Sequence, residues 1–212
     1  MRDLSCGRII FGMGTCCYYV AVSIDGFIAK ADDSLDWVRH IPQHNSFSVL
    51  GGEAVDLFEY HRFFSSVDVL VMGRRTFEVL MSFMEFPYPD KRVFVCTRGE
   101  VDTRDLALVT VTNEDPVSLV DNLKHEFKNR IWIVGGGGLA ATLMKGGVID
   151  EIILTLVPTV LGSGIRLFGE GNFEQDWERK ELVALNNGLT QIRFQKKRKG
   201  LRESLFIPAS NL

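Results

Sequence analysis

Hydrophobic positions along the chain fall into short runs typical of strands, and these runs alternate with segments whose apolar residues recur every three or four positions. Runs rich in Val, Ile and aromatic residues predict buried strands, and the wider spacing predicts helices with one buried face. Helices are expected at 53–64, from 77 onward, after Asp115-Pro116 and at 139–144, with a short helical turn around Trp37. Strands are expected at 16–24, 67–72, 92–97, 106–112, 131–134, 151–157, 181–185 and 190–196.

The order of these elements predicts one α/β domain. Strands and helices alternate over most of the chain, which is typical of a mostly parallel sheet with helices on both faces. The last two strands flank Asn-Asn-Gly-Leu at 186–189, a strong hairpin signal, so one edge of the sheet is expected to be antiparallel. The chain has 212 residues and 46% hydrophobic positions, which supports a single core. We expect an irregular N-terminal extension at 1–15, one domain at 16–198 and a C-terminal tail at 199–212.

Composition narrows the function classes. There are 24 Lys and Arg residues against 27 Asp and Glu, a net charge of −3, so neither nucleic acid nor an anionic membrane is an expected partner. No apolar run approaches the roughly 18 residues that a membrane-spanning helix needs. The four cysteines show neither disulfide nor metal spacing, and the four histidines form no ligand cluster. We therefore expect a cytoplasmic protein without a bound metal.

Two predicted strand-to-helix junctions carry residues suited to binding phosphate. In Met-Gly-Arg-Arg-Thr at 72–76, the glycine allows close approach of a ligand and two guanidiniums can pair with phosphates. In Val-Gly-Gly-Gly-Gly-Leu at 134–139, four residues without Cβ can lie under a pyrophosphate. Either junction alone also fits close packing of a helix on a strand, but the pair favours a dinucleotide. Arg98 adds a cation suited to a ribose 2′-phosphate, which favours NADPH over NADH.

Two acids are candidates for the proton source of a reductase. Protonating an imine or enamine needs a carboxyl in a dry pocket, where burial raises its pKa. Asp56 has the apolar neighbours Val55, Leu57 and Phe58, which suit such a pocket, although acids on helices more often face solvent. Asp25 precedes a glycine and also fits a turn in which the carboxylate bonds to its own backbone. The sequence spacing does not decide whether Asp56 or Asp25 is the proton source.

Several motifs in order resemble the dihydrofolate-reductase-like superfamily. They are Ser-Ile-Asp-Gly-Phe-Ile-Ala at 23–29, Val-Met-Gly-Arg-Arg-Thr-Phe-Glu at 71–78, Ile-Trp-Ile-Val-Gly-Gly-Gly at 131–137 and Ile-Asp-Glu-Ile-Ile-Leu-Thr at 149–155, continued by Val-Pro at 157–158 and Leu-Gly-Ser-Gly-Ile at 161–165. The branch they resemble most is the reductase (C-terminal) domain of the bifunctional deaminase-reductase of riboflavin biosynthesis. The sequence lacks the zinc deaminase signature, and it lacks the Trp-Pro pair that dihydrofolate reductases carry before the acid-bearing helix.

The resemblance implies a three-layer α-β-α fold, with a mixed, mostly parallel central sheet and a C-terminal antiparallel hairpin, and it implies NADPH as the cofactor. By motif, Ala21 and Ile28 would lie near the nicotinamide. Asp56 and Thr155 resemble the helical acid of dihydrofolate reductases and the threonine that bonds to it, whereas in the riboflavin branch Asp25 would contact the substrate. The phosphates and the adenosine would be held by Gly73, Arg74, Arg75 and Thr76, by Thr97 and Arg98, and by Gly135, Gly136, Gly138 and Leu139.

These features predict an NADPH-dependent reductase that transfers hydride to a C=N or C=O group. Its expected partner is a small-molecule substrate, either a pteridine- or pyrimidine-like heterocycle or a sugar-derived compound, as in riboflavin biosynthesis. The alternative is a nucleotide-binding protein of the same fold without turnover, in a sensor or interaction role. The apolar segment 157–168 is either core or the isologous interface of a homodimer.

Overall fold

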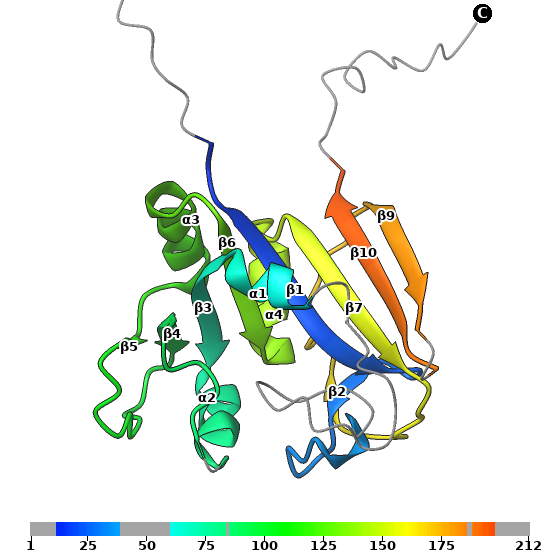
Figure 1. Cartoon of the computed structure of the whole chain (residues 1–212), viewed down its shortest axis with the longest axis horizontal. Coiled ribbons are helices and arrows are strands. Elements are labelled where there is room, and N and C mark those ends of the chain that lie inside the picture. The colour runs from blue at the N-terminus through cyan, green and yellow to red at the C-terminus, as the bar shows by residue number, and fades with distance from the viewer. Residues whose placement is uncertain (1–11, 39–59, 84, 186–187, 198–212) are drawn as a thin grey trace, which may run out of the picture.

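The computed structural model describes residues 12–38, 60–83, 85–185 and 188–197. They build one eight-stranded sheet (Figure 1) whose neighbouring strands are parallel except at one edge, where β10 is antiparallel both to β7 and to β9. The mixed, mostly parallel sheet and the C-terminal antiparallel pair confirm the predicted fold class. From one edge to the other the strands are β5 (Val109–Thr112), β4 (Arg92–Cys96), β3 (Val67–Gly73), β6 (Arg130–Gly135), β1 (Thr15–Ser23), β7 (Glu151–Val157), β10 (Thr190–Lys196) and β9 (Trp177–Ala184).

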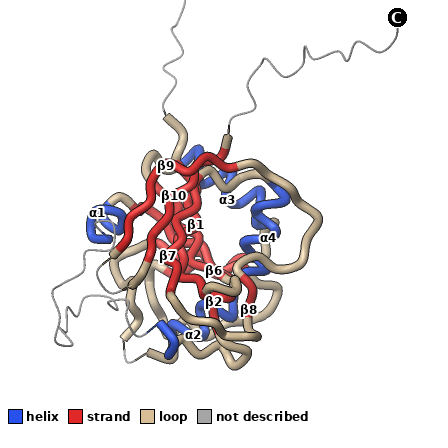
Figure 2. Tube along the Cα trace, turned by 90° about the vertical axis from the view of Figure 1, so that its right-hand side faces the viewer, coloured by secondary structure: helices blue, strands red, loops and turns tan. Residues whose placement is uncertain are grey.

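Helices cover both faces of the sheet and complete the three layers. Figure 2 shows α1 (Tyr60–Ser65) on one side of the strands, with α3 (Pro116–Glu126) and α4 (Gly137–Gly146) on the other. The helix α2 (Arg74–Met81) packs into the same core as α1. Each face therefore has its own hydrophobic core, one with α1 and α2 and one with α3 and α4.

The strand β1 runs through the middle of the sheet and contributes to both cores. Cys16 and Tyr18 belong to the core under α3 and α4, whereas Cys17 and Tyr19 belong to the core under α1 and α2. Because successive side chains of a strand point to opposite faces, a strand covered on both sides is apolar at every position rather than at every second one. This explains the unbroken run of Cys, Tyr and Val at 16–20.

The ends of α3 and α4 follow the chemistry of their sequences. The Asp115 carboxylate accepts a hydrogen bond from the Ser118 amide at 2.9 Å, and Pro116 occupies the first turn, where its missing N–H is no loss. The helix α4 is capped at its C-terminus by Gly147, whose φ of 68° lies in the left-handed region. The start of α3 after Asp115 and Pro116 was expected from the sequence.

Several boundaries differ from the predictions. The strand β9 begins at Trp177 rather than 181, because an edge strand with exposed charges from 178 to 181 has no apolar alternation to reveal it. The strand β5 begins at Val109 rather than 106, and α4 begins at Gly137, inside the glycine run, rather than at 139. A small antiparallel pair, β2 (Phe27–Ala29) with β8 (Ile165–Arg166), was not predicted.

Some predictions lie partly or wholly outside the described residues. The helix expected at 53–64 is described only from Tyr60, as α1, and Asp56 is not covered. The short helical turn that carries Trp37 is confirmed as a 3-10 helix, Asp36–Val38. Residues 1–11 and 198–212 are not covered, and the dimer interface suggested at 157–168 stays a prediction. Within the described ranges, none of the helices has the length and apolar character needed to cross a membrane.

Candidate active site

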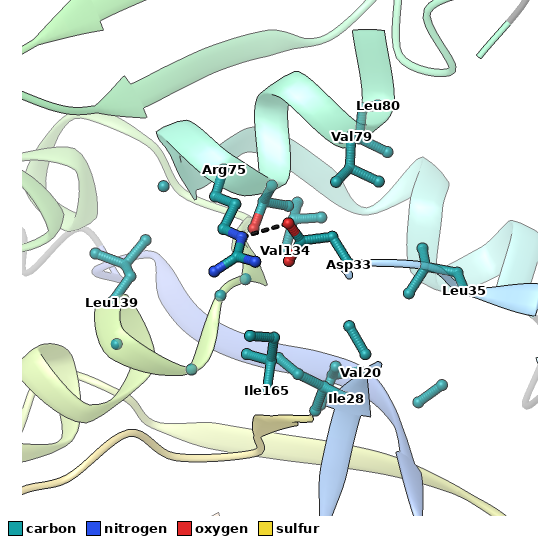
Figure 3. A pocket seen from close by; sticks show the side chains of 18 of the residues that line it. Val20, Ile28, Asp33, Leu35, Arg75, Val79, Leu80, Val134, Leu139 and Ile165 are labelled. Atoms are coloured by element: carbon teal, nitrogen blue, oxygen red, sulfur yellow. Dashed lines mark hydrogen bonds and ion pairs between the residues drawn. The ribbon is translucent and has the colours of Figure 1, made fainter. Parts of the chain in front are cut away.

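A cavity of about 620 Å³ opens at the carboxyl ends of β1, β3 and β6. Its walls come from these strand ends, from the first turns of α2 and α4, and from the β2 and β8 pair (Figure 3). In sheets of this kind, helix N-termini at the carboxyl edge direct unpaired N–H groups toward a ligand. The cavity includes these residues predicted to bind the cofactor: Ala21, Ile28, Gly73, Arg74, Arg75, Thr76, Gly135, Gly136, Gly138 and Leu139.

The junction between β6 and α4 leaves backbone rather than side chains facing the cavity. Gly136 is the N-cap of α4 and offers no side chain to bond the first amides of the helix. Gly135 has a φ of 150°, and the peptide bond between Gly135 and Gly136 is cis. At Gly138 an added Cβ would meet nothing within 4 Å, so this position opens onto free space. The first amides of α4 can therefore reach an anionic group.

The junction between β3 and α2 meets the glycine junction directly. The hydroxyl of Thr76 lies 3.4 Å from where a Cβ of Gly135 would stand and 3.5 Å from that of Gly136. Arg74, in the first turn of α2, is paired through Nε with Glu78 Oε1 at 2.7 Å and is half exposed. Its Nη1 atom lies 3.0 Å from the Cβ position of Gly99, in the loop after β4. Two segments far apart in sequence thus place a hydroxyl, a guanidinium and free amides around one cavity.

The side chain of Arg75 extends along the cavity and contacts the loop that follows β2. Its guanidinium pairs with the Asp33 carboxylate and donates from Nη2 to the carbonyl oxygen of Ala31 at 3.4 Å. Figure 3 shows this pair between Leu139 on one side and Leu35 on the other. Both arginine side chains are at least half exposed, 51% for Arg74 and 60% for Arg75, so an incoming phosphate can reach them and share them with their acidic partners.

Thr97 and Arg98 follow β4 and do not line the cavity. The Thr97 hydroxyl accepts a hydrogen bond from the Gly99 amide at 3.1 Å, which shapes the loop beside Arg74. Arg98 is exposed. The structure therefore places both residues near the Arg74 end of the site, and their suggested contact with adenosine stays a prediction.

Asp25 lies outside the cavity and is engaged by the protein itself. Its carboxylate accepts hydrogen bonds from the Ser23 hydroxyl at 2.7 Å and from the amides of Leu161 and Gly162, the latter at 2.7 Å. These donors, Ser23 first, lower the pKa of Asp25 to about 2. Near neutral pH the Asp25 carboxyl is therefore ionised and has no proton to donate. Its hydrogen bonds join the turn after β1 to the loop at 161–162, and we call this connection the Asp25 clamp.

Asp25 is expected to make stability depend on pH only in acidic solution. Its pKa of about 2 in the fold lies below the unfolded value of about 3.9, so its contribution is complete above the unfolded value and is lost as the pH falls through 2. Asp25→Asn should therefore lower the melting temperature at neutral pH, and the difference from the wild type should shrink toward pH 2. Circular dichroism melts over this range measure it. A difference independent of pH would contradict the clamp.

A buried polar row lies beside the cavity, across three strands. Thr155 of β7 pairs in register with Ala21 of β1 on one side and with Gln191 of β10 on the other. Thr155 is 1% exposed and Gln191 is fully buried. The Gln191 Nε2 atom donates to Thr155 Oγ1 at 3.2 Å and to the hydroxyl of Tyr19, a residue that lines the cavity, at 2.7 Å. Sequence reasoning found Thr155 but missed Tyr19 and Gln191, because only the strand register brings them together.

Comparisons with known proteins identify the family of this chain and agree with its fold. Residues 15–191 match the model of a family described as the RibD C-terminal domain. The uncharacterized protein YwjB of Bacillus subtilis is 41% identical over 153 residues, which cover 72% of this chain and 81% of YwjB. A crystal structure of a Shewanella protein assigned to riboflavin biosynthesis is 29% identical, with a TM-score of 0.72 over 87% of this chain and 99% of its own. A dihydrofolate reductase from Enterococcus faecalis, complexed with NADP(H), shares the fold at 18% identity and a TM-score of 0.58, over 89% of this chain and all of its own.

Proposed function

Because the chain belongs to the RibD C-terminal domain family, we propose that it is a reductase that uses NADPH to reduce a C=N or C=O group of a small heterocyclic or sugar-derived molecule. The observation that carries this proposal is the meeting of two glycine junctions and two arginines at one cavity. One junction supplies free amides and the other supplies guanidiniums, which together suit a phosphorylated dinucleotide.

The cavity residues fit the parts of NADPH. The amides at the start of α4, next to Gly136 and Gly138, would hold the pyrophosphate, because no side chain stands between them and the cavity. Arg74 would hold the ribose 2′-phosphate, since its guanidinium faces the loop after β4. Arg75 would bind a phosphate while sharing its charge with Asp33. The bound cofactor would supply the hydride for the reaction.

The protein orients the reactants and keeps water away from them. Ala21 and Ile28, which carry no polar side chain, line the part of the cavity formed by β1 and β2. Leu35 and Val38 continue this apolar wall. A small residue such as Ala21 leaves room for a flat ring against the strand, and the apolar wall excludes water that would compete for the reactive intermediate. Reduction of C=N or C=O consumes one proton as well as one hydride, so the site also needs a proton donor.

Titration with NADPH followed by a turnover assay tests the proposal. We expect NADPH to bind and to be oxidised in the presence of the phosphoribosylaminopyrimidine intermediate of riboflavin synthesis or of dihydrofolate, each supplied as a purified substrate. Fluorescence of the reduced nicotinamide measures binding, and loss of its absorbance measures oxidation. Binding without oxidation would favour a nucleotide-binding role without turnover. No binding at millimolar NADPH would contradict both functions.

A further inference from the structure

The polar row formed by Tyr19, Thr155 and Gln191 is not explained by packing. It lies at the border between the cavity and the core of α1 and α2, where the neighbouring side chains are mostly apolar. Burying polar groups is unfavourable unless they are hydrogen-bonded, and Gln191 bonds both to Tyr19 and to Thr155. The Gln191 side chain is fully buried, and its Oε1 atom has no hydrogen-bond partner within the part of the chain that the structure describes. An amide in such a place costs stability, which suggests that it serves the site.

Gln191 sets the direction of the hydrogen bond at Tyr19. Its Nε2 atom donates to the Tyr19 hydroxyl at 2.7 Å, so the phenol oxygen is the acceptor and the phenol proton points away from Gln191. The second proton of the same nitrogen goes to Thr155 Oγ1 at 3.2 Å, which holds the amide in place. A donor aimed at the phenol oxygen also stabilises negative charge on that oxygen.

The ring of Tyr19 packs against two neighbouring aromatic rings. It contacts Phe63 edge-on, with ring centroids 4.8 Å apart, and Trp132 at a tilt, with ring centroids 6.1 Å apart. The indole Nε1 of Trp132 donates to the carbonyl oxygen of Tyr19 at 3.0 Å, which fixes the backbone at this point of β1. The side chain of Tyr19 therefore lies on the same face of β1 as Ala21, two residues further along the strand, and both residues line the cavity.

The other titratable groups described around the cavity suit proton donation less well. Asp25 lies outside the cavity with a pKa of about 2. Asp33 lines the cavity but pairs with Arg75 at the end formed by α2. Tyr88 also lines the cavity, and burial raises its pKa well above the usual value for a phenol. Tyr19 lines the same cavity and accepts a hydrogen bond from the buried amide of Gln191.

We propose that Tyr19 is the group that hydrogen-bonds the substrate atom next to the hydride-accepting carbon and donates the proton to it. This rests on the reductase function proposed above. As the hydride forms a C–H bond, the π pair of the C=N or C=O group moves to nitrogen or oxygen and takes the phenol proton. The O–H bond of Tyr19 breaks, the phenolate is stabilised by the N–H of Gln191, and a water proton restores the phenol after the product leaves. Gln191 is then a positioning residue.

The experiment compares Tyr19→Phe with the matched control Tyr18→Phe. Tyr18 is the preceding residue and is also buried. Its replacement by Phe also removes a hydrogen bond, the one from its hydroxyl to the carbonyl oxygen of Leu167 at 3.0 Å, but Tyr18 faces the opposite core. In single-turnover reactions with saturating NADPH and the phosphoribosylaminopyrimidine, Tyr19→Phe is expected to slow NADPH oxidation at least about a hundredfold. NADPH affinity should change less than twofold, and Tyr18→Phe should keep the wild-type rate.

Two further measurements keep the test decisive. Gln191→Met preserves volume but removes the donor, and it should lower kcat about tenfold with the KM for NADPH unchanged, a split that a merely structural role would not produce. Calorimetry with NADP⁺ present should show pyrimidine binding weakened about tenfold by Tyr19→Phe.

Equal rates and affinities in Tyr19→Phe and wild type would overturn the assignment, as would a wild type that does not bind the pyrimidine. A wild type that binds it but oxidises no NADPH would instead refute the proposed function, while the binding comparison would still decide the role of Tyr19.

Discussion

Replacing both Arg74 and Arg75 by Ala is expected to weaken NADPH binding at least about a hundredfold and NADH binding less than about tenfold. Hydrogen bonds to charged groups contribute about 1.5–3 kcal/mol each, and about 1.4 kcal/mol corresponds to a tenfold change in affinity. Both arginines are paired with an acid, Arg74 with Glu78 and Arg75 with Asp33, but only Arg74 is shown beside the loop after β4. Arg74→Ala alone should therefore account for most of the discrimination against NADH.

Calorimetric titration of each variant with both nucleotides measures this effect. Arg92→Ala is the matched control, because its side chain is 59% exposed and paired with an acid, Glu126, yet it lies at the start of β4 rather than at the cavity. It should leave both affinities unchanged. Equal losses for NADPH and NADH in the Arg74→Ala variant would contradict the assignment of the 2′-phosphate to this residue.

Gly137→Ala is expected to destabilise the fold by about 3 kcal/mol, because its Cβ would stand 2.1 Å from the carbonyl oxygen of Arg166. The obstacle is backbone, held in place because the amide of Gly169 donates to the Gly137 carbonyl oxygen at 2.9 Å, so neither segment can yield by a side-chain rotation. In a chain of this length, a loss of 3 kcal/mol lowers the melting temperature by about 6–12 °C. Thermal unfolding of the nucleotide-free protein measures it.

Gly138→Ala is the matched comparison one residue further along α4. Nothing lies within 4 Å of its Cβ position, and Ala is favoured over Gly in a helix by up to about 1 kcal/mol, so the melting temperature should hold or rise. The new methyl group faces the cavity and should weaken NADPH binding about tenfold or more. Unchanged NADPH affinity in this variant would show that the pyrophosphate does not approach α4 at Gly138.

Elements whose signals are local could be predicted closely. The strands at 151–157 and 190–196 have the predicted bounds, because an apolar run and its turn residues are contiguous in the sequence. The start of α3 followed from Asp115 and Pro116 alone. By contrast, the β2 and β8 pair joins two- and three-residue segments that are more than a hundred positions apart, and neither has a pattern of its own.

The candidate site likewise combines features that the local sequence predicts and features that depend on tertiary contacts. The sequence alone determined the two glycine junctions, because each is written in consecutive residues: a glycine followed by two arginines within 72–76, and four glycines within 134–139. Only the tertiary structure decided that the junctions meet at Thr76, that Asp25 is held by the amides of a distant loop, and that Gln191 bonds to Tyr19. Those contacts depend on strand order and register, which arise from burying both faces of one sheet rather than from any local run of residues.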